Sequence, residues 1–216
     1  MNNSPSEHCP PHIHPLLGWF LAAAEGRFPR VDGGTTFLPP MANGDEASVA
    51  FTGHAVICSR LTAHDLAELD PHGFGGSHDP RVLLTMAGVG EIGVLDVTLA
   101  RRGAGGGTLV RTDRWNDHPR VHYARALRRD VAVFGDERGL VTLAAGLGGR
   151  LEMSVETPGD THGTSVGRGL IGEAVALVPA GVPVFAAVSP GNARSLRAFL
   201  SQGFTPIGSE VIVHPK

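Results

Sequence analysis

The sequence has few cysteines and no long apolar run. Its two cysteines, Cys9 and Cys58, form no disulfide or metal-ligand pattern, which favours a reducing compartment. The longest apolar run, residues 16–24, is far shorter than the ~20 residues that a membrane-spanning helix needs. The first residues, MNNSPSEHCPP, lack the basic start of a secretory signal. We therefore expect a cytoplasmic protein that has no membrane partner.

An excess of basic residues is also missing. The formal net charge is -3, and the 18 Lys and Arg residues are scattered apart from short clusters. Because nucleic-acid-binding proteins present a concentrated positive surface, we expect no nucleic-acid partner. The apolar share of 42% and the charged share of 18% are typical of a globular protein.

No histidine or cysteine group has clear metal-ligand spacing. Residues 1–15 are polar and proline-rich, and they include His8, Cys9, His12 and His14. A metal site is conceivable there, but no backbone pattern would hold the ligands, so we expect a disordered tail. The later histidines also lack ligand spacing and are interpreted as surface or packed residues: His54, His64, His72 and His78. We expect no metal. Glycine pairs at 88–93 and 103–107 do not join a strand to a helix, which argues against dinucleotide binding.

Residues 16–91 form an N-terminal α/β region whose fold cannot be derived from the pattern. A short helix is expected at 16–24, one buried strand at 47–59, and short helices at 62–69 and 79–88. In the last of these, Asp79 is the expected cap and Pro80 the first helical residue. The region is expected to extend the sheet, to cover a substrate or to form a homodimer contact.

Residues 92–216 alternate strands and helices more regularly. A strand is expected at 92–100, a helix at 119–129, a hairpin at 131–134 and 140–145, then strand 150–157, helix 165–177, strand 182–189, helix 193–202 and strand 207–213. The expected fold class is α/β: a mixed, largely antiparallel sheet flanked by helices, with an N-terminal α/β extension.

The segment NARSLRAFLSQGF at 192–204 follows an apolar strand and precedes a terminal strand. It resembles the Asn-x-x-Ala/Ser-x-x-x-Tyr-x-x-x-Gly-Phe segment of the GNAT N-acetyltransferase superfamily, and the resemblance covers roughly residues 92–216. It implies acetyl-CoA as co-substrate. Asn192 then caps a helix beside the CoA arm, with Ser195 and Phe199 on the cofactor side. Phe199 stands where the family often has a tyrosine that acts as general acid.

The resemblance also implies a pyrophosphate-binding loop at the start of the helix at 165–177. Backbone N–H groups and the helix dipole favour the phosphate charge there. By its glycines, the family pattern Gln/Arg-x-x-Gly-x-Gly/Ala fits TSVGRG at 164–169; the other register, HGTSVG at 162–167, has His162 in place of Gln or Arg and Ser165 in place of the first glycine. We prefer the register at 162–167, because it gives a short loop and a full-length helix. The cofactor-binding residues are then His162, Gly163, Thr164, Ser165, Val166, Gly167 and Arg168.

The strand LEMSVET at 151–157 carries the expected catalytic residues. Period-two alternation places Glu152, Ser154 and Glu156 on one face and Met153 and Val155 on the other. In the family this strand separates from the next one, here 182–189, and the acyl thioester lies in the V-shaped opening between them. The resemblance implies that Glu152 or Glu156 is the general base.

Backbone groups of the same strand, at Val155 and Thr157, are expected to bind the cofactor.

The function implied is transfer of an acetyl group from acetyl-CoA to an amine by direct attack in a ternary complex. The acceptor is a small molecule or a protein lysine. Because Phe199 lacks the tyrosine hydroxyl, the alternative is a non-catalytic acyl-CoA-binding module with a sensory or regulatory role.

Overall fold

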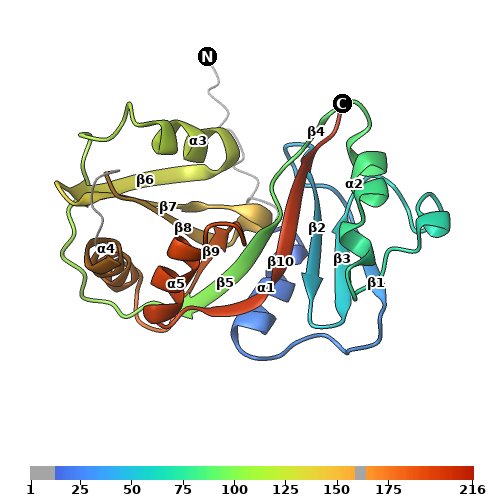
Figure 1. Cartoon of the computed structure of the whole chain (residues 1–216), viewed down its shortest axis with the longest axis horizontal. Coiled ribbons are helices and arrows are strands. Elements are labelled where there is room, and N and C mark those ends of the chain that lie inside the picture. The colour runs from blue at the N-terminus through green and yellow to red at the C-terminus, as the bar shows by residue number, and fades with distance from the viewer. Residues whose placement is uncertain (1–12, 159–163) are drawn as a thin grey trace, which may run out of the picture.

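The structure, a computed structural model, describes residues 13–158 and 164–216 (Figure 1). Most of the expected tail at 1–15, including the histidine and cysteine group at its start, lies outside the described residues. Its last part packs on the body of the protein. The His14 ring bonds to the Pro39 carbonyl oxygen over 2.9 Å and accepts a hydrogen bond from the Leu16 N–H.

A single open sheet forms the centre of the described chain. Its strands follow the order β1-β3-β2-β10-β5-β9-β8-β7-β6, and the short β4 pairs with β10. The strands are β1 (Thr35–Leu38), β2 (Glu46–Phe51), β3 (His54–Cys58), β4 (Glu91–Ile92), β5 (Asp96–Arg102), β6 (Arg129–Asp136), β7 (Gly139–Ala145), β8 (Leu151–Glu156), β9 (Pro183–Val188) and β10 (Thr205–His214). Of the named strand pairs in the described chain, β1–β3 and β8–β9 are parallel and the others antiparallel. The fold is therefore α/β, with a mixed, mostly antiparallel open sheet flanked by helices.

Helices cover both faces of this sheet. They are α1 (Leu16–Ala24), α2 (Pro80–Ala87), α3 (Pro119–Leu127), α4 (Thr164–Leu177) and α5 (Ala193–Ser201). On β5, Leu99 packs in the apolar core with α4 and α5, whereas Ala100 packs with α1 on the other face. This alternation is the period-two pattern of a strand buried on both sides. In Figure 1, α4 lies beyond β8 at one end of the molecule and β1 at the other.

The N-terminal region extends the sheet, the first of the three roles considered for it. β10 pairs with β2 along one edge and with β5 along the other, and so joins strands from both halves of the chain. The expected single strand at 47–59 is wrong: it is the hairpin β2–β3. The chain turns at Thr52 and Gly53, and Gly53 adopts φ +68°, which a residue without Cβ tolerates.

Other expectations for this region need smaller corrections. The expected helix at 62–69 is a short 3₁₀ turn at Ala67–Leu69, although Thr62 and Asp65 do exchange hydrogen bonds as an N-terminal cap pair. β1 was not predicted.

The strand expected at 92–100 is divided into β4 and β5. At Gly93 the backbone N–H bonds to Ile212, and the exposed Val94 and Leu95 then leave the ladder. Helix 79–88, the hairpin at 131–145 and the elements from 150 to 213 are confirmed to within a few residues.

One buried arginine connects the central strands. The Arg150 guanidinium donates to Glu152 at 2.9 Å and to Glu210 on β10 at 2.5 and 2.6 Å, and its side chain is fully buried. It also lies 4.4 Å from the ring centre of Phe20 on α1. Burial alone would lower the pKa of Arg150, but the Glu210 and Glu152 carboxylates raise it on balance, so the group stays charged.

Arg150→Met is expected to destabilise the fold by about 3–5 kcal/mol, because two buried carboxylates lose their common partner. The measurement is the free energy of unfolding in urea. Arg138→Met is the matched control: Arg138 pairs with Asp136 and Glu173 at the surface, with 40% of its side chain exposed, and is expected to contribute about 1 kcal/mol or less. Equal unfolding midpoints for the two variants would contradict this role of Arg150.

Candidate functional site

The two parallel strands β8 and β9 pair at a single position. Glu152 is registered with Phe185, and no further pair follows toward Glu156 and Val188 within the described chain. β8 is meanwhile fully paired with β7, and β9 with β5. The strands therefore separate toward their carboxyl ends, and the β8 edge from Met153 to Glu156 faces the space between them.

The carboxyl end of β8 leads to the start of α4. His162 and Gly163 lie outside the described residues, and Thr164 is the first residue of the helix. Ser165 is exposed in its first turn. Gly167 and Gly169, the glycines of the register at 164–169, both lie inside the helix, and Gly167 also ends the register at 162–167.

Several expected cofactor residues meet where β8 and α4 adjoin. A Cβ built on Gly167 would lie 3.8 Å from the Thr157 methyl group, so the end of β8 touches the first turns of α4. Val155 packs against the apolar core beneath α4 and α5. Val166 and Arg168 are half-buried on the helix. The strand end and the helix start thus form one continuous surface.

The residues expected at α5 are Asn192, which precedes the helix, and Ser195 and Phe199 within it. The Asn192 side chain caps the helix by accepting a hydrogen bond from the Ser195 N–H at 3.1 Å. Phe199, in contrast, is only 6% exposed, and its ring packs edge-on against Phe204 with 5.0 Å between ring centres. Phe199 therefore serves the core, and it offers no proton to a leaving group.

The face expected for the carboxylates of β8 is confirmed. Met153 and Val155 pack in the core with α4 and α5. On the opposite face, the Ser154 and Thr142 hydroxyls lie 2.6 Å apart, and Glu156 receives a hydrogen bond from Arg120 at 2.9 Å.

The Glu152 carboxylate is held in buried ion pairs, although the resemblance made it one of the two candidate bases. Its side chain is 5% exposed and pairs with Arg150 at 2.9 Å and with Arg128 at 2.5 Å. Burial alone would raise the pKa of Glu152, but the two guanidinium groups lower it on balance. A carboxylate held between two cations is a weak proton acceptor, which leaves Glu156, with 38% of its side chain exposed, as the accessible carboxylate of this strand.

A third carboxylate, Asp96, was not predicted from the sequence. It begins β5, the strand on the other side of β9, and is half-buried next to the Arg150 cluster. Burial, and then the charges of Glu210 and Glu152, raise the pKa of Asp96 to about 6, despite the opposing charges of Arg150 and Arg128. A pKa in that range suits a proton acceptor near neutral pH. From the sequence, the alternation of side chains along β5 predicts that Asp96 and Thr98 share one face. It does not predict that β9 and then β8 lie beside β5 in the sheet, which is what brings Asp96 near the opening.

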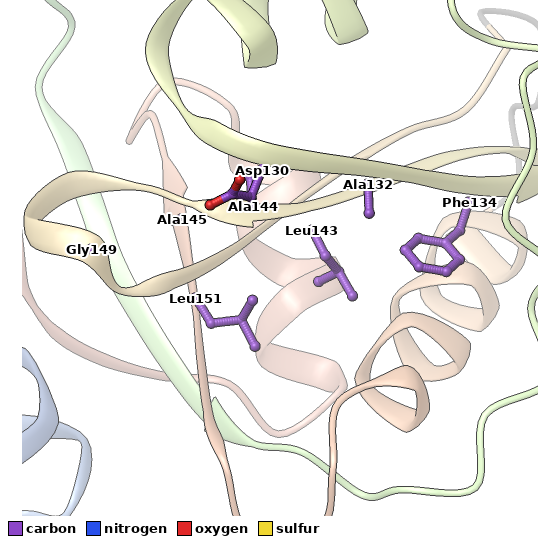
Figure 2. A pocket seen from close by; sticks show the side chains of 8 residues that line it. All are labelled: Asp130, Ala132, Phe134, Leu143, Ala144, Ala145, Gly149 and Leu151. Atoms are coloured by element: carbon purple, nitrogen blue, oxygen red, sulfur yellow. The ribbon is translucent and has the colours of Figure 1, made fainter. Parts of the chain in front are cut away.

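A separate apolar depression of about 370 Å³ lies on the core side of β6, β7 and β8, and Figure 2 shows the side chains that line it. It is lined by Asp130, Ala132, Phe134, Leu143, Ala144, Ala145, Gly149 and Leu151. Leu151 is the first residue of β8, so the depression lies at the end of the strand opposite to the one that separates from β9. It contains none of the predicted site residues.

Within the described ranges, no group of three or more His, Cys, Asp or Glu side chains is placed to hold a metal ion. Among the described helices, none is both long and apolar enough to cross a membrane. Comparisons with protein-family models, curated proteins and solved structures gave no match for this chain.

Asp96→Asn is expected to raise the melting temperature at pH 8 and to leave it nearly unchanged at pH 4. The folded pKa of about 6 lies above that of an unfolded aspartate, about 4, so the folded state binds the proton more tightly. The native charge therefore costs stability that grows as the pH rises from about 4 through 6.

The measurement is a series of thermal melts of wild type and variant between these pH values. Exposed Asp117 provides the control, because Asp117→Asn should show no such trend. A difference between Asp96→Asn and wild type that is the same at both pH values would contradict the assignment.

Proposed function

We propose that the protein is an acyl-CoA-dependent N-acyltransferase of GNAT type that acts in the cytoplasm on an amine, either a small molecule or a protein lysine. The observation that carries the proposal is the single register pair between β8 and β9, beside the start of a 14-residue helix. A separated strand edge leaves backbone groups without strand partners, and a ligand in the space between the strands can satisfy them. The described part of the motif at 162–167 lies at the start of α4, and the motif at 192–204 covers α5, which packs in the same core as α4.

The arrangement suits an acyl-CoA in two respects. The backbone N–H groups in the first turn of a helix such as α4 have no partner inside the helix and lie at the positive end of the helix dipole, which favours a pyrophosphate. The β8 edge from Met153 to Glu156 presents backbone groups to the opening, where an N–H can polarise the thioester carbonyl as an oxyanion donor does.

The chemical step needs one proton acceptor. The amine nitrogen attacks the thioester carbonyl carbon, the carbon–sulfur bond breaks, and CoA departs as a thiolate. With a thiol pKa near ~8.5, the thiolate can leave unprotonated, so the missing hydroxyl at Phe199 does not prevent the reaction. The amine proton passes to Glu156 on β8 or to Asp96 on β5, the accessible carboxylates near the opening. Holding both substrates in one space supplies much of the acceleration.

The burial of Phe199 and of Glu152 favours one alternative, an acyl-CoA-binding module without catalysis. Such a module would bind acetyl-CoA at the same opening, and it would release no CoA in the presence of amines.

Acetyl-CoA is expected to stabilise the fold by about 2.7 kcal/mol at a hundredfold excess over its dissociation constant, measured as a thermal shift. Ser165→Asp should abolish the shift, because a fixed negative charge would lie where the pyrophosphate binds. The same charge favours the helix start, so the fold itself should persist.

Gly169→Asp is the matched control. A side chain there meets no atom within 4 Å, and it lies about one turn further along α4. Loss of the shift with Gly169→Asp and not with Ser165→Asp would select the register at 164–169. A flat response of the wild type at millimolar acetyl-CoA would overturn the proposed function.

Glu156→Gln is expected to lower turnover roughly 10²–10⁴-fold with an unchanged acetyl-CoA thermal shift, because a positioned base contributes that much. Part of the rate should return at high pH, where more of the amine is already deprotonated. CoA release across a panel of primary amines measures turnover.

Asp96→Asn in the same assay separates the two carboxylates, and exposed Glu68→Gln is the control. If Asp96→Asn alone is slow, Asp96 is the base. Wild-type rates in both the Glu156→Gln and the Asp96→Asn variants would contradict a carboxylate base. If the wild type releases no CoA with any amine, the alternative of a non-catalytic acyl-CoA-binding module is correct.

A further inference from the structure

Three polar side chains form a hydrogen-bonded chain at the N-terminal end of the sheet. The His54 Nδ1 atom lies 2.8 Å from the Asp32 carboxylate, and its Nε2 atom lies 3.0 Å from the Thr36 hydroxyl. Thr36 is on β1 and His54 on β3, the two outermost strands on this side of the sheet. In Figure 1, β1 lies at the opposite end of the molecule from α4. The group is therefore separate from the opening between β8 and β9.

The partners determine where the protons lie. The hydrogen bond from His54, and then one from the Gly34 N–H at 2.8 Å, lower the pKa of Asp32, so its carboxylate is an acceptor only. His54 Nδ1 must then carry the proton. In a neutral imidazole this leaves the Nε2 lone pair to accept the proton of the Thr36 hydroxyl. This tautomer is the one that a hydroxyl nucleophile needs from its general base.

The surrounding chain holds the imidazole in place. Trp19 stacks on the His54 ring with 5.5 Å between ring centres and 6° between planes. The loop at 72–74 packs directly on the histidine backbone, since a Cβ on Gly73 would lie 2.4 Å from the His54 Cα. The His54 side chain is 11% exposed, so its rotamer is fixed on several sides.

Apolar and partly exposed side chains lie next to the His54 end of the group. Val31 is 63% exposed and Phe74 is 66% exposed, and both pack beside Gly53, next to His54 in the chain. Because β1 is an edge strand, alternate N–H groups, those of Thr35 and Phe37, point away from β3 toward the open edge. Exposed N–H groups beside a nucleophile can bind a carbonyl oxygen, and apolar surface suits an uncharged acyl group.

We propose that Thr36, His54 and Asp32 form a second catalytic site, which hydrolyses carboxylic esters that carry a small apolar acyl group. The Thr36 proton passes to His54 Nε2 as Oγ1 bonds to the ester carbonyl carbon. The ester carbon–oxygen bond then breaks, and His54 returns the proton to the departing alcohol. A water molecule next attacks the acyl-threonine and gives a proton to His54. The carboxylic acid leaves, and the Thr36 hydroxyl is restored with that proton. Asp32 is a positioning residue.

The experiment is hydrolysis of p-nitrophenyl butyrate by the full chain, with nitrophenolate release followed by absorbance. Thr36→Val keeps the shape of the side chain and removes the hydroxyl, and it should lower the rate about a hundredfold or more. Thr36→Ser should keep measurable activity and show a butyryl adduct by intact mass. His54→Gln should match Thr36→Val.

Asp32→Asn should lower kcat and leave KM nearly unchanged, because Asp32 orients the imidazole and does not touch the ester. A merely structural role would change KM and the melting temperature together with kcat.

Thr85→Val is the control, since the exposed Thr85 hydroxyl lies on α2, away from this group, and donates to the Arg81 carbonyl oxygen at 2.8 Å. It should retain the wild-type rate. Thermal melts establish that each variant is folded. Hydrolysis by Thr36→Val at the wild-type rate, or by the wild type no faster than by buffer alone, would overturn the proposal.

Discussion

The centre of the sheet depends on the ion pairs of the buried Arg150 guanidinium. Arg150 lies in the connection between β7 and β8, and its side chain extends over Phe185 on β9 to bind Glu210 on β10. The same guanidinium also binds Glu152 on β8. These contacts span the strands from β8 to β10, and two of the contacted residues, Glu152 and Phe185, form the register pair of β8 and β9. The same ion pairs therefore hold the closed end of the opening, and beyond them β8 is free to diverge.

This arrangement also explains why the carboxylates near the opening differ. Glu152 and Glu210 each bind Arg150, and Arg128 adds a second cation to Glu152. Asp96 lies next to the same cluster and is the third carboxylate near two guanidinium groups, so its negative charge is the least compensated. Burial and like charges thus raise the pKa of Asp96, whereas the two guanidinium groups lower the pKa of Glu152.

Local signals in the sequence predict much of the C-terminal half. The Asp79 and Asn192 caps mark helix starts, and both are seen as caps in the structure. Strand alternation correctly predicts the face of Glu156. The β2–β3 hairpin was missed because Thr52 and Gly53 interrupt a continuous β-rich run without a change in composition. The ion pairs that hold Glu152 and the position of Asp96 near the opening depend on the order of the strands in the sheet. That order is decided by contacts between residues far apart in the sequence. No local pattern contains that information.

The position of β10 has a consequence for synthesis on the ribosome. β2 and β5 are made early, yet the strand that lies between them is made from residues 205–214. Until those residues emerge, β2 and β5 each expose an unpaired edge, and Arg150 lacks its Glu210 partner. The nascent chain must therefore carry two open sheet edges and a half-paired buried arginine until translation has almost reached the end of this sequence, a period in which chaperone contact would protect it.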